Sequence, residues 1–128
     1  IRAVAKAAGE PVPETTAATV RAALESVAAA IRRTVIELDD LLGRRVGRVH
    51  VVGGGVQNAL ICQMIADATG RPVVAGPVEA TAIGNLLVQL LASNGRLDLR
   101  ALRSVVRDSF EPVHYEPRDA ARWDARLG

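Results

Sequence analysis

The chain of 128 residues has the length of one domain, and its 49% hydrophobic and 23% charged residues are ordinary values for a folded domain, which argues against disorder. Sixteen basic and fourteen acidic residues are interspersed and leave a net charge of only +2, so we expect no binding of nucleic acid or of a membrane surface. No run approaches the roughly twenty apolar residues of a membrane-spanning helix.

The single cysteine bears on the cell compartment and on metal binding. Cys62 excludes an internal disulfide and fits a reducing cytoplasm, and its neighbours Ile61 and Ile65 predict that the thiol is buried. His50 and His114 lie sixty-four positions apart, which matches no familiar spacing of metal ligands. We therefore expect a cytoplasmic protein with no metal site in this chain.

A short helical stretch at residues 1–8 opens the chain, and the segment GEPVPETT then interrupts regular structure with one glycine and two prolines. Because the chain begins at Ile1, within a helical pattern, we interpret it as part of a longer protein.

The longest regular pattern predicts a helix over residues 16–42, about 40 Å long at about 1.5 Å per residue. Thr15 or Thr16 can cap its start, and Gly43 can end it in a left-handed conformation. Apolar residues recur on one face at steps of four and three: Val20, Leu24, Val27, Ile31, Val35, Leu38 and Leu42.

The β-branched run RVHVV, residues 48–52, predicts an interior strand of a parallel sheet. We expect Asn94 and Gly95 to end the helix before them and Asp98 to cap the one after, with a tail beyond Val106. The remaining elements are expected at residues 56–69 (helix), 72–75 (strand), 80–93 (helix) and 99–106 (helix).

This alternating order predicts an α/β fold, mostly helical, with two short parallel strands. Since sheets commonly hold about five or six strands, either further strands are hidden in this chain or the rest of the sheet lies in sequence outside it, and we favour the second interpretation.

Three consecutive glycines, Gly53, Gly54 and Gly55, join the first predicted strand to a helix. A helix that starts there leaves backbone N–H groups unpaired, and glycine lets a phosphate approach the backbone closely. Asn58 follows and could cap the helix or bind a ligand. GGGVQN lacks the Lys of the phosphate loop and the last Gly of GxGxxG, so a tight turn without a ligand remains an alternative to a phosphate or nucleotide site.

Several polar residues near this turn have simpler interpretations. Asp67 is expected on the solvent face of its helix and Glu79 at the start of the next helix, so neither is a favoured catalytic base. Gln57 could contact a ligand or solvent equally well. Thr81 and Gly84 are expected to let their helix pack closely against its neighbours.

Three stretches resemble the FGGY family of carbohydrate kinases, in its carboxy-terminal region and most closely in its rhamnulokinase members. They are ESVAAAIRRTVIELDDLLGR, HVVGGGVQNALICQMIADATGRPVVAGPVEATAIGNLLVQLLASN and VVRDSFEPVHYEP. The most discriminating parts are GGGVQN, ADATGRPVVAGPVEATAIGN and VRDSF, which stand in the family's order and spacing. The resemblance covers residues 1–117, which we assign to the kinase's nucleotide-binding domain, with residues 118–128 as a tail.

The resemblance implies part of an actin-like ATPase fold, whose domains are ribonuclease-H-like, with ATP and sugar in a cleft between two domains. It implies transfer of the γ-phosphoryl group of MgATP to a sugar hydroxyl, the 1-hydroxyl of L-rhamnulose in the rhamnulokinase members. Carried over by position, Gly54 contacts the nucleotide, Gly53 and Gly55 shape the turn, and Asn58 contacts adenine or ribose.

The resemblance also implies that the catalytic aspartate and the sugar-binding residues lie outside this chain, which we expect to be inactive alone. The alternative is a noncatalytic kinase half that acts as an interaction module. Surface exposed by the absent domain could also support dimers. A dinucleotide-binding domain is disfavoured because no strand ending in Asp or Glu follows the glycines by about twenty residues.

Overall fold

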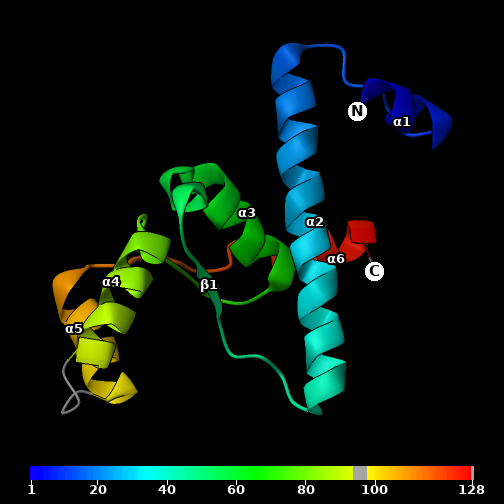
Figure 1. Ribbon diagram of the computed structural model, residues 1–128. Helices are drawn as coiled ribbons and strands as arrows, with labels where there is room; N and C mark the ends of the chain where they lie inside the picture. Colours follow the sequence, from blue (N-terminus) through cyan, green and yellow to red (C-terminus); the bar gives the residue numbers. More distant parts are fainter. Residues whose placement is uncertain (94–97, 128) are drawn as a thin grey trace.

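The computed structural model describes residues 1–93 and 98–127. In this part of the chain six α-helices, one short 3-10 helix and three strands follow one another (Figure 1). Their bounds are α1 (Arg2–Ala7), α2 (Thr16–Leu42), β1 (Val49–Val51), η1 (Gly54–Gln57), α3 (Ala59–Thr69), β2 (Val73–Ala75), α4 (Ala80–Ser93), α5 (Leu99–Ser109), β3 (Val113–Tyr115) and α6 (Ala120–Leu127). None of the helices in the described ranges is long and apolar enough to cross a membrane.

The sheet has the order β1–β2–β3 and is mixed. β1 and β2 are parallel, as the sequence predicts, with His50 opposite Val74. β3 runs antiparallel to β2 and places His114 on the other side of Val74. The expectation of only two strands is therefore wrong, because a third strand forms in the segment expected to be a tail.

Helix α2 has the predicted bounds and the predicted ends. The Thr15 hydroxyl accepts a hydrogen bond from the N–H of Ala18 at 3.1 Å, and Gly43 adopts φ 61° at the carboxyl end. The covered positions on its predicted apolar face all lie in the middle of α2, between Leu24 and Val35, because its partner α3 is much shorter, and within that stretch Val27 is still exposed. Leu24, Ala28, Ile31 and Val35 are buried or half-buried, whereas Val20, Val27, Leu38 and Leu42 on the same predicted stripe are exposed.

The core lies where α3 packs between α2, the sheet and α6. Cys62 and Val73 are fully buried at its centre, which confirms the prediction of a buried thiol. Half-buried Val49 and Val51 of β1 pack against the same core, so α3 covers this face of the sheet. Gly70 ends α3 with φ 63°, as expected.

The end of α2 is joined to the sheet by one buried arginine. Arg71 is only 5% exposed, forms an ion pair with Asp39 of α2, and donates from Nε to the carbonyl of Val46 at 2.7 Å and from Nη1 to the carbonyl of Thr69 at 3.1 Å. The other carboxylate oxygen of Asp39 accepts from the N–H of Val46 at 2.6 Å. This cluster fixes the segment that leads from α2 into β1.

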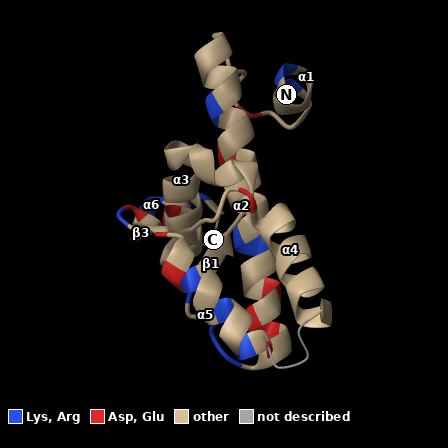
Figure 2. Cartoon of the chain, turned by 60° about the vertical axis from the view of Figure 1, so that its left-hand side comes forward, with Lys and Arg blue, Asp and Glu red and all other residues tan. Residues whose placement is uncertain are grey.

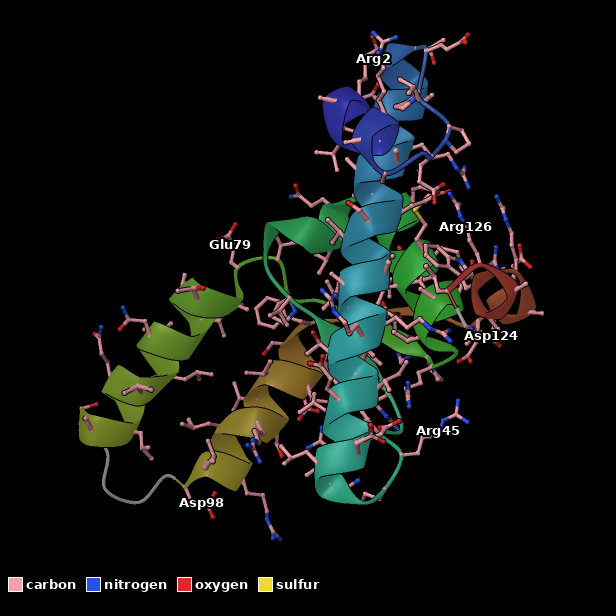
Figure 3. The ribbon with its side chains drawn as sticks, turned by 90° about the vertical axis from the view of Figure 1, so that its right-hand side faces the viewer. Arg2, Arg45, Glu79, Asp98, Asp124 and Arg126 are labelled. Atoms are coloured by element: carbon pink, nitrogen blue, oxygen red, sulfur yellow. The ribbon has the colours of Figure 1, made fainter. Side chains whose placement is uncertain are left out.

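Residues 118–128, expected to be a tail, contain α6, which packs against α3 beside α2 (Figures 1 and 3). Asp124 and Arg126 of α6 form ion pairs with Arg32 at 2.8 Å and with Glu25 at 3.1 Å, both on α2. Trp123 adds apolar contact to the core. The end of the described chain is therefore packed on α3 and joined to α2 by ion pairs.

Helices α4 and α5 lie on the opposite side of the sheet region from α2 (Figure 1). Asp98 caps α5 by accepting from the N–H of Ala101 at 2.7 Å, as predicted, and the helix extends to Ser109. α4 is described as far as Ser93, and its expected stop at Asn94 and Gly95 lies outside the described residues. No residue of α4 is buried, and a Cβ at Gly84 would meet open space, so the expected close packing is absent in the described chain.

Candidate functional site

The chain leaves β1 through a tight turn at residues 53–55, here called the glycine turn. Only the first of its three glycines has a backbone conformation that requires glycine. Gly53 has φ 78°, and its N–H donates to the carbonyl of Pro77 at 3.1 Å, on the loop that follows β2. A helix was expected from Val56, but the 3-10 helix η1 intervenes, and α3 begins at Ala59. The correction follows from Asn58, whose extended backbone separates the two helices.

The three glycines differ in what the chain requires of them. Gly53 has a positive φ that L side chains rarely adopt, so the turn needs it. Gly54 has an ordinary φ, and a Cβ built on it meets no atom within 4 Å. Gly55 meets only the Val51 side chain, at 4.0 Å. The space above Gly54 is open in this chain, and a group from outside could enter it.

Asn58 serves as the amino-terminal cap of α3. Its Oδ1 accepts from the N–H groups of Leu60 at 3.1 Å and Ile61 at 3.2 Å. The sequence left a cap and a ligand contact as alternatives, and the structure supplies the cap. The Nδ2 group of the same exposed side chain remains the donor that could reach a ligand.

The capping changes which backbone donors are open for a ligand. The expected donors were the first N–H groups of the helix after the strand, but Asn58 already satisfies two of them in α3. Gly54 and Gly55 open η1, where the first N–H groups of a helical turn have no partner inside it. Both glycines are exposed, so their N–H groups can face a ligand.

A hollow of about 500 Å³ lies next to η1, at the carboxyl end of β2. Such a position is where ligands usually bind in open α/β sheets. Gln57 and Glu79 contribute polar groups, and Phe110 contributes an aromatic wall from the segment after α5. Gly54 and Gly55 are the first two residues of η1 and do not line the hollow. Phe110 was missed as a site residue, because nothing local in the sequence links it to the turn.

The two carboxylates singled out beforehand have no catalytic setting in the described chain. Asp67 is half-buried rather than on the solvent face, and its Oδ1 accepts from the N–H groups of Arg118 at 2.7 Å and Asp119 at 3.3 Å. Glu79 lies just before α4 at the rim of the same hollow, and its exposed side chain is directed outward (Figure 3). Within the described ranges, no group of three or more His, Cys, Asp or Glu side chains could hold a metal ion.

Known proteins similar to this chain are sugar kinases. Residues 1–93 match the FGGY family of carbohydrate kinases, C-terminal domain. The chain is 41% identical over 125 residues to a rhamnulokinase of Bacteroides thetaiotaomicron, covering 98% of this chain and 26% of that protein. It is also 41% identical over 117 residues to a rhamnulokinase of Klebsiella pneumoniae, covering 91% of this chain and 24% of that protein.

A solved structure agrees with these relatives. The crystal structure of xylulose kinase from Rhodospirillum rubrum superposes with a TM-score of 0.63 at 28% identity, over 93% of this chain and 24% of that one. This likeness confirms the expected fold class, an α/β part of the actin-like ATPase fold. The chain spans about a quarter of the length of the relatives it matches. From the match over residues 1–93 we conclude that the chain belongs to the FGGY family of carbohydrate kinases and contains its C-terminal domain.

Proposed function

We propose that this chain is the carboxy-terminal, ATP-binding segment of a cytoplasmic kinase that transfers the γ-phosphoryl group of MgATP to a sugar hydroxyl. The acceptor is the 1-hydroxyl of L-rhamnulose, a choice supported by the two rhamnulokinases at 41% identity. The family match supports the reaction type.

The open space above Gly54 carries the nucleotide assignment. Neither the backbone angle nor the packing of the described chain requires a glycine there. The same is true of Gly47, but Gly54 stands at the start of η1, where exposed N–H groups have no partner inside the turn, and this position supports the approach of a ligand. We assign the N–H groups of Gly54 and Gly55 to the α-phosphate side of ATP, and the Nδ2 group of Asn58 to its adenosine. Gly53 holds the turn in place.

The described residues offer groups that can bind ATP but no set of ligands for its Mg²⁺ ion. Mg²⁺ neutralises charge on the transferring phosphates, and a base orients the accepting hydroxyl. The described part of the chain offers no cluster of carboxylates for the ion, and Asp67 is engaged by the segment before α6. We therefore place the magnesium ligands and the catalytic aspartate in other parts of the full-length kinase.

Gly54→Val in the full-length kinase tests the nucleotide role. The valine side chain would occupy the space above the turn, so we expect KM for ATP to rise about tenfold or more, with little change in KM for the sugar. Gly47→Val is the matched control, since Gly47 also has an ordinary φ and open space but lies before β1. An unchanged KM for ATP in the Gly54 variant would refute the assignment.

An assay on the isolated 128-residue chain tests whether the groups that promote phosphoryl transfer lie in other parts of the full-length kinase. With MgATP and L-rhamnulose we expect no sugar phosphate, because the groups that promote transfer lie elsewhere. Phosphate transfer by this chain alone would show that it contains those groups itself.

A noncatalytic interaction module is the second candidate, favoured by the apolar surface of α4. Leu86, Val88 and Leu90 are 59%, 63% and 44% exposed, and such surface promotes association, including dimers. The two candidates differ in the full-length protein: a kinase turns over ATP in the presence of L-rhamnulose, whereas a module binds its partner without consuming ATP.

A further inference from the structure

A second groove lies on the sheet face opposite α3, between the sheet and α5. It has a volume of about 620 Å³, within the usual range for small-molecule sites. His50 and Val74 form its sheet side. They alternate with core-facing residues of β1 and β2, which places them on the face that α3 leaves uncovered. None of Gly53, Gly54 and Gly55 lines it.

Three arginines of α5 line the same groove. Arg100, Arg103 and Arg107 stand at steps of three and four, which places them on one face of the helix over about 10 Å. Basic positions recur along α5 in Figure 2. Arg107 donates to the Ser104 hydroxyl at 2.9 Å, and none of the three arginines lies within 4.0 Å of a carboxylate in the described chain. Glu111 is the one carboxylate among the groove's described lining residues.

The rest of the groove is apolar. Val74 is only 8% exposed and forms the base of the groove. Val106 of α5 and Phe110, which directly follows α5, form one wall. Guanidinium groups match the geometry of phosphate oxygens. The apolar part of an organic ligand is more stable against an apolar wall than in bulk water. A ligand for this groove therefore combines an anionic group with a compact apolar or ring-shaped part.

We propose that this groove is a binding site for a small organic phosphate, with the phosphate on Arg103 and Arg107 and the organic part on Phe110 and Val74. Arg100 lies one turn away and receives a second anionic group where the ligand has one. The groove shares Phe110 and Pro77 with the hollow beside η1, but its arginines do not line that hollow, so the phosphate position proposed here does not depend on whether Gly54 contacts ATP.

Calorimetry on the full-length protein tests the proposal, with the glycine turn saturated by a non-hydrolysable ATP analogue and magnesium. Two probes separate the sources of affinity: inorganic phosphate supplies the anion alone, and phenyl phosphate adds an apolar ring. We expect saturable binding of phenyl phosphate, about tenfold tighter than that of inorganic phosphate, because the ring is buried on Phe110.

Substitutions locate the site. Arg103→Gln and Arg107→Gln should each weaken both probes about tenfold, through the loss of a charge-assisted hydrogen bond. Phe110→Ala should weaken phenyl phosphate alone. Arg44→Gln is the control, since Arg44 is exposed and lies outside the groove. The arginines are exposed, so we expect all these variants to fold with an unchanged thermal midpoint.

Three results would overturn the proposal. Absence of saturable binding of either probe removes the site. Equal weakening by Arg44→Gln reduces the effect to long-range charge. Affinity that is unchanged by the α5 variants but lost in Gly54→Val moves both probes to the glycine turn.

Discussion

Arg71 and Asp39, thirty-two positions apart, form an ion pair that is nearly enclosed by the protein, with side chains 6% and 21% exposed. The pair joins the last turns of α2 to the residues between α3 and β2. Two backbone carbonyls satisfy further N–H groups of Arg71, so the charge is buried with its hydrogen bonds made. A buried charge loses this compensation when its partner is removed.

We expect Arg71→Ala to lower the free energy of unfolding by about 3–5 kcal/mol, because it leaves the Asp39 carboxylate without its ion partner. Asp39→Ala should act similarly, and the double variant should cost less than the sum of the two. Urea unfolding of the three variants measures this. Arg122→Ala, whose pair with Asp119 is at 4.0 Å with both side chains more than half exposed, is the control and should change stability by less than about 1 kcal/mol. Additive costs for Arg71 and Asp39 would show that the pair is not coupled.

Asn58 is expected to have two separable roles, as a cap through Oδ1 and as a ligand donor through Nδ2. Asn58→Ala should lose about 1 kcal/mol of stability and raise KM for ATP. Asn58→Ser keeps a capping oxygen without the amide donor, so it should keep the stability and still raise KM. Thermal unfolding and ATP kinetics on the full-length kinase measure both quantities. A serine variant with wild-type KM would leave Asn58 with the capping role alone.

Asp67 is expected to hold the segment before α6 and to take no part in catalysis. Asp67→Ala should remove the acceptor for Arg118 and Asp119 and raise hydrogen exchange at those two amides, whereas Asp67→Asn keeps an acceptor oxygen and should preserve protection. A general base contributes about 100- to 10,000-fold, so kcat of the Asn variant should fall by far less. A loss in that range would instead make Asp67 a catalytic residue.

Burial raises the pKa of the Cys62 thiol from its ordinary value of 9.0. The folded chain then holds this proton more tightly than the unfolded chain, so stability falls as pH rises above the unfolded pKa and through the folded one. We expect a loss of up to about 1.4 kcal/mol per pH unit in that window. Urea unfolding at about pH 8 and about pH 10 measures it against Cys62→Ala, which lacks the titrating group. Equal losses in both proteins would exclude Cys62 as the source.

Local signals in the sequence predicted the helices well. The alternating apolar steps between Val20 and Leu42, with a threonine before and a glycine after, specify α2 without any partner. Asp98 specifies the start of α5 in the same way. The periodicity could not show how much of the α2 stripe is covered, because coverage depends on the length of α3.

Strand β3 and helix α6 could not be predicted by the same means. β3 has only three residues and lies in the stretch between Pro112 and Pro117. Its partner β2 is about forty positions earlier in the sequence. α6 has eight residues, too few to be stable alone, and its ion pairs reach back to Glu25 and Arg32. Both elements depend on tertiary contacts that a local pattern does not contain.

The candidate site likewise has one part that local sequence specifies and one part that depends on tertiary contacts. The glycines and Asn58 form a contiguous motif, which the sequence displays. The hollow beside them also needs Phe110, which β3 brings to the end of β2. The sequence predicts a helix from Val56, but α3 begins only at Ala59. Capping of α3 by Asn58 depends on backbone angles that the amino-acid sequence does not specify locally.

The hydrogen bond from Gly53 to Pro77 joins the loop after β1 to the loop after β2. Pro77 stands only three residues before α4 begins at Ala80. A second hydrogen bond, from the N–H of Gly76 to the carbonyl of Val51 at 2.9 Å, joins the same two segments. The glycine turn and the start of α4 are therefore attached to one another through the backbone of the loop after β2, although they are separated by more than twenty residues of sequence.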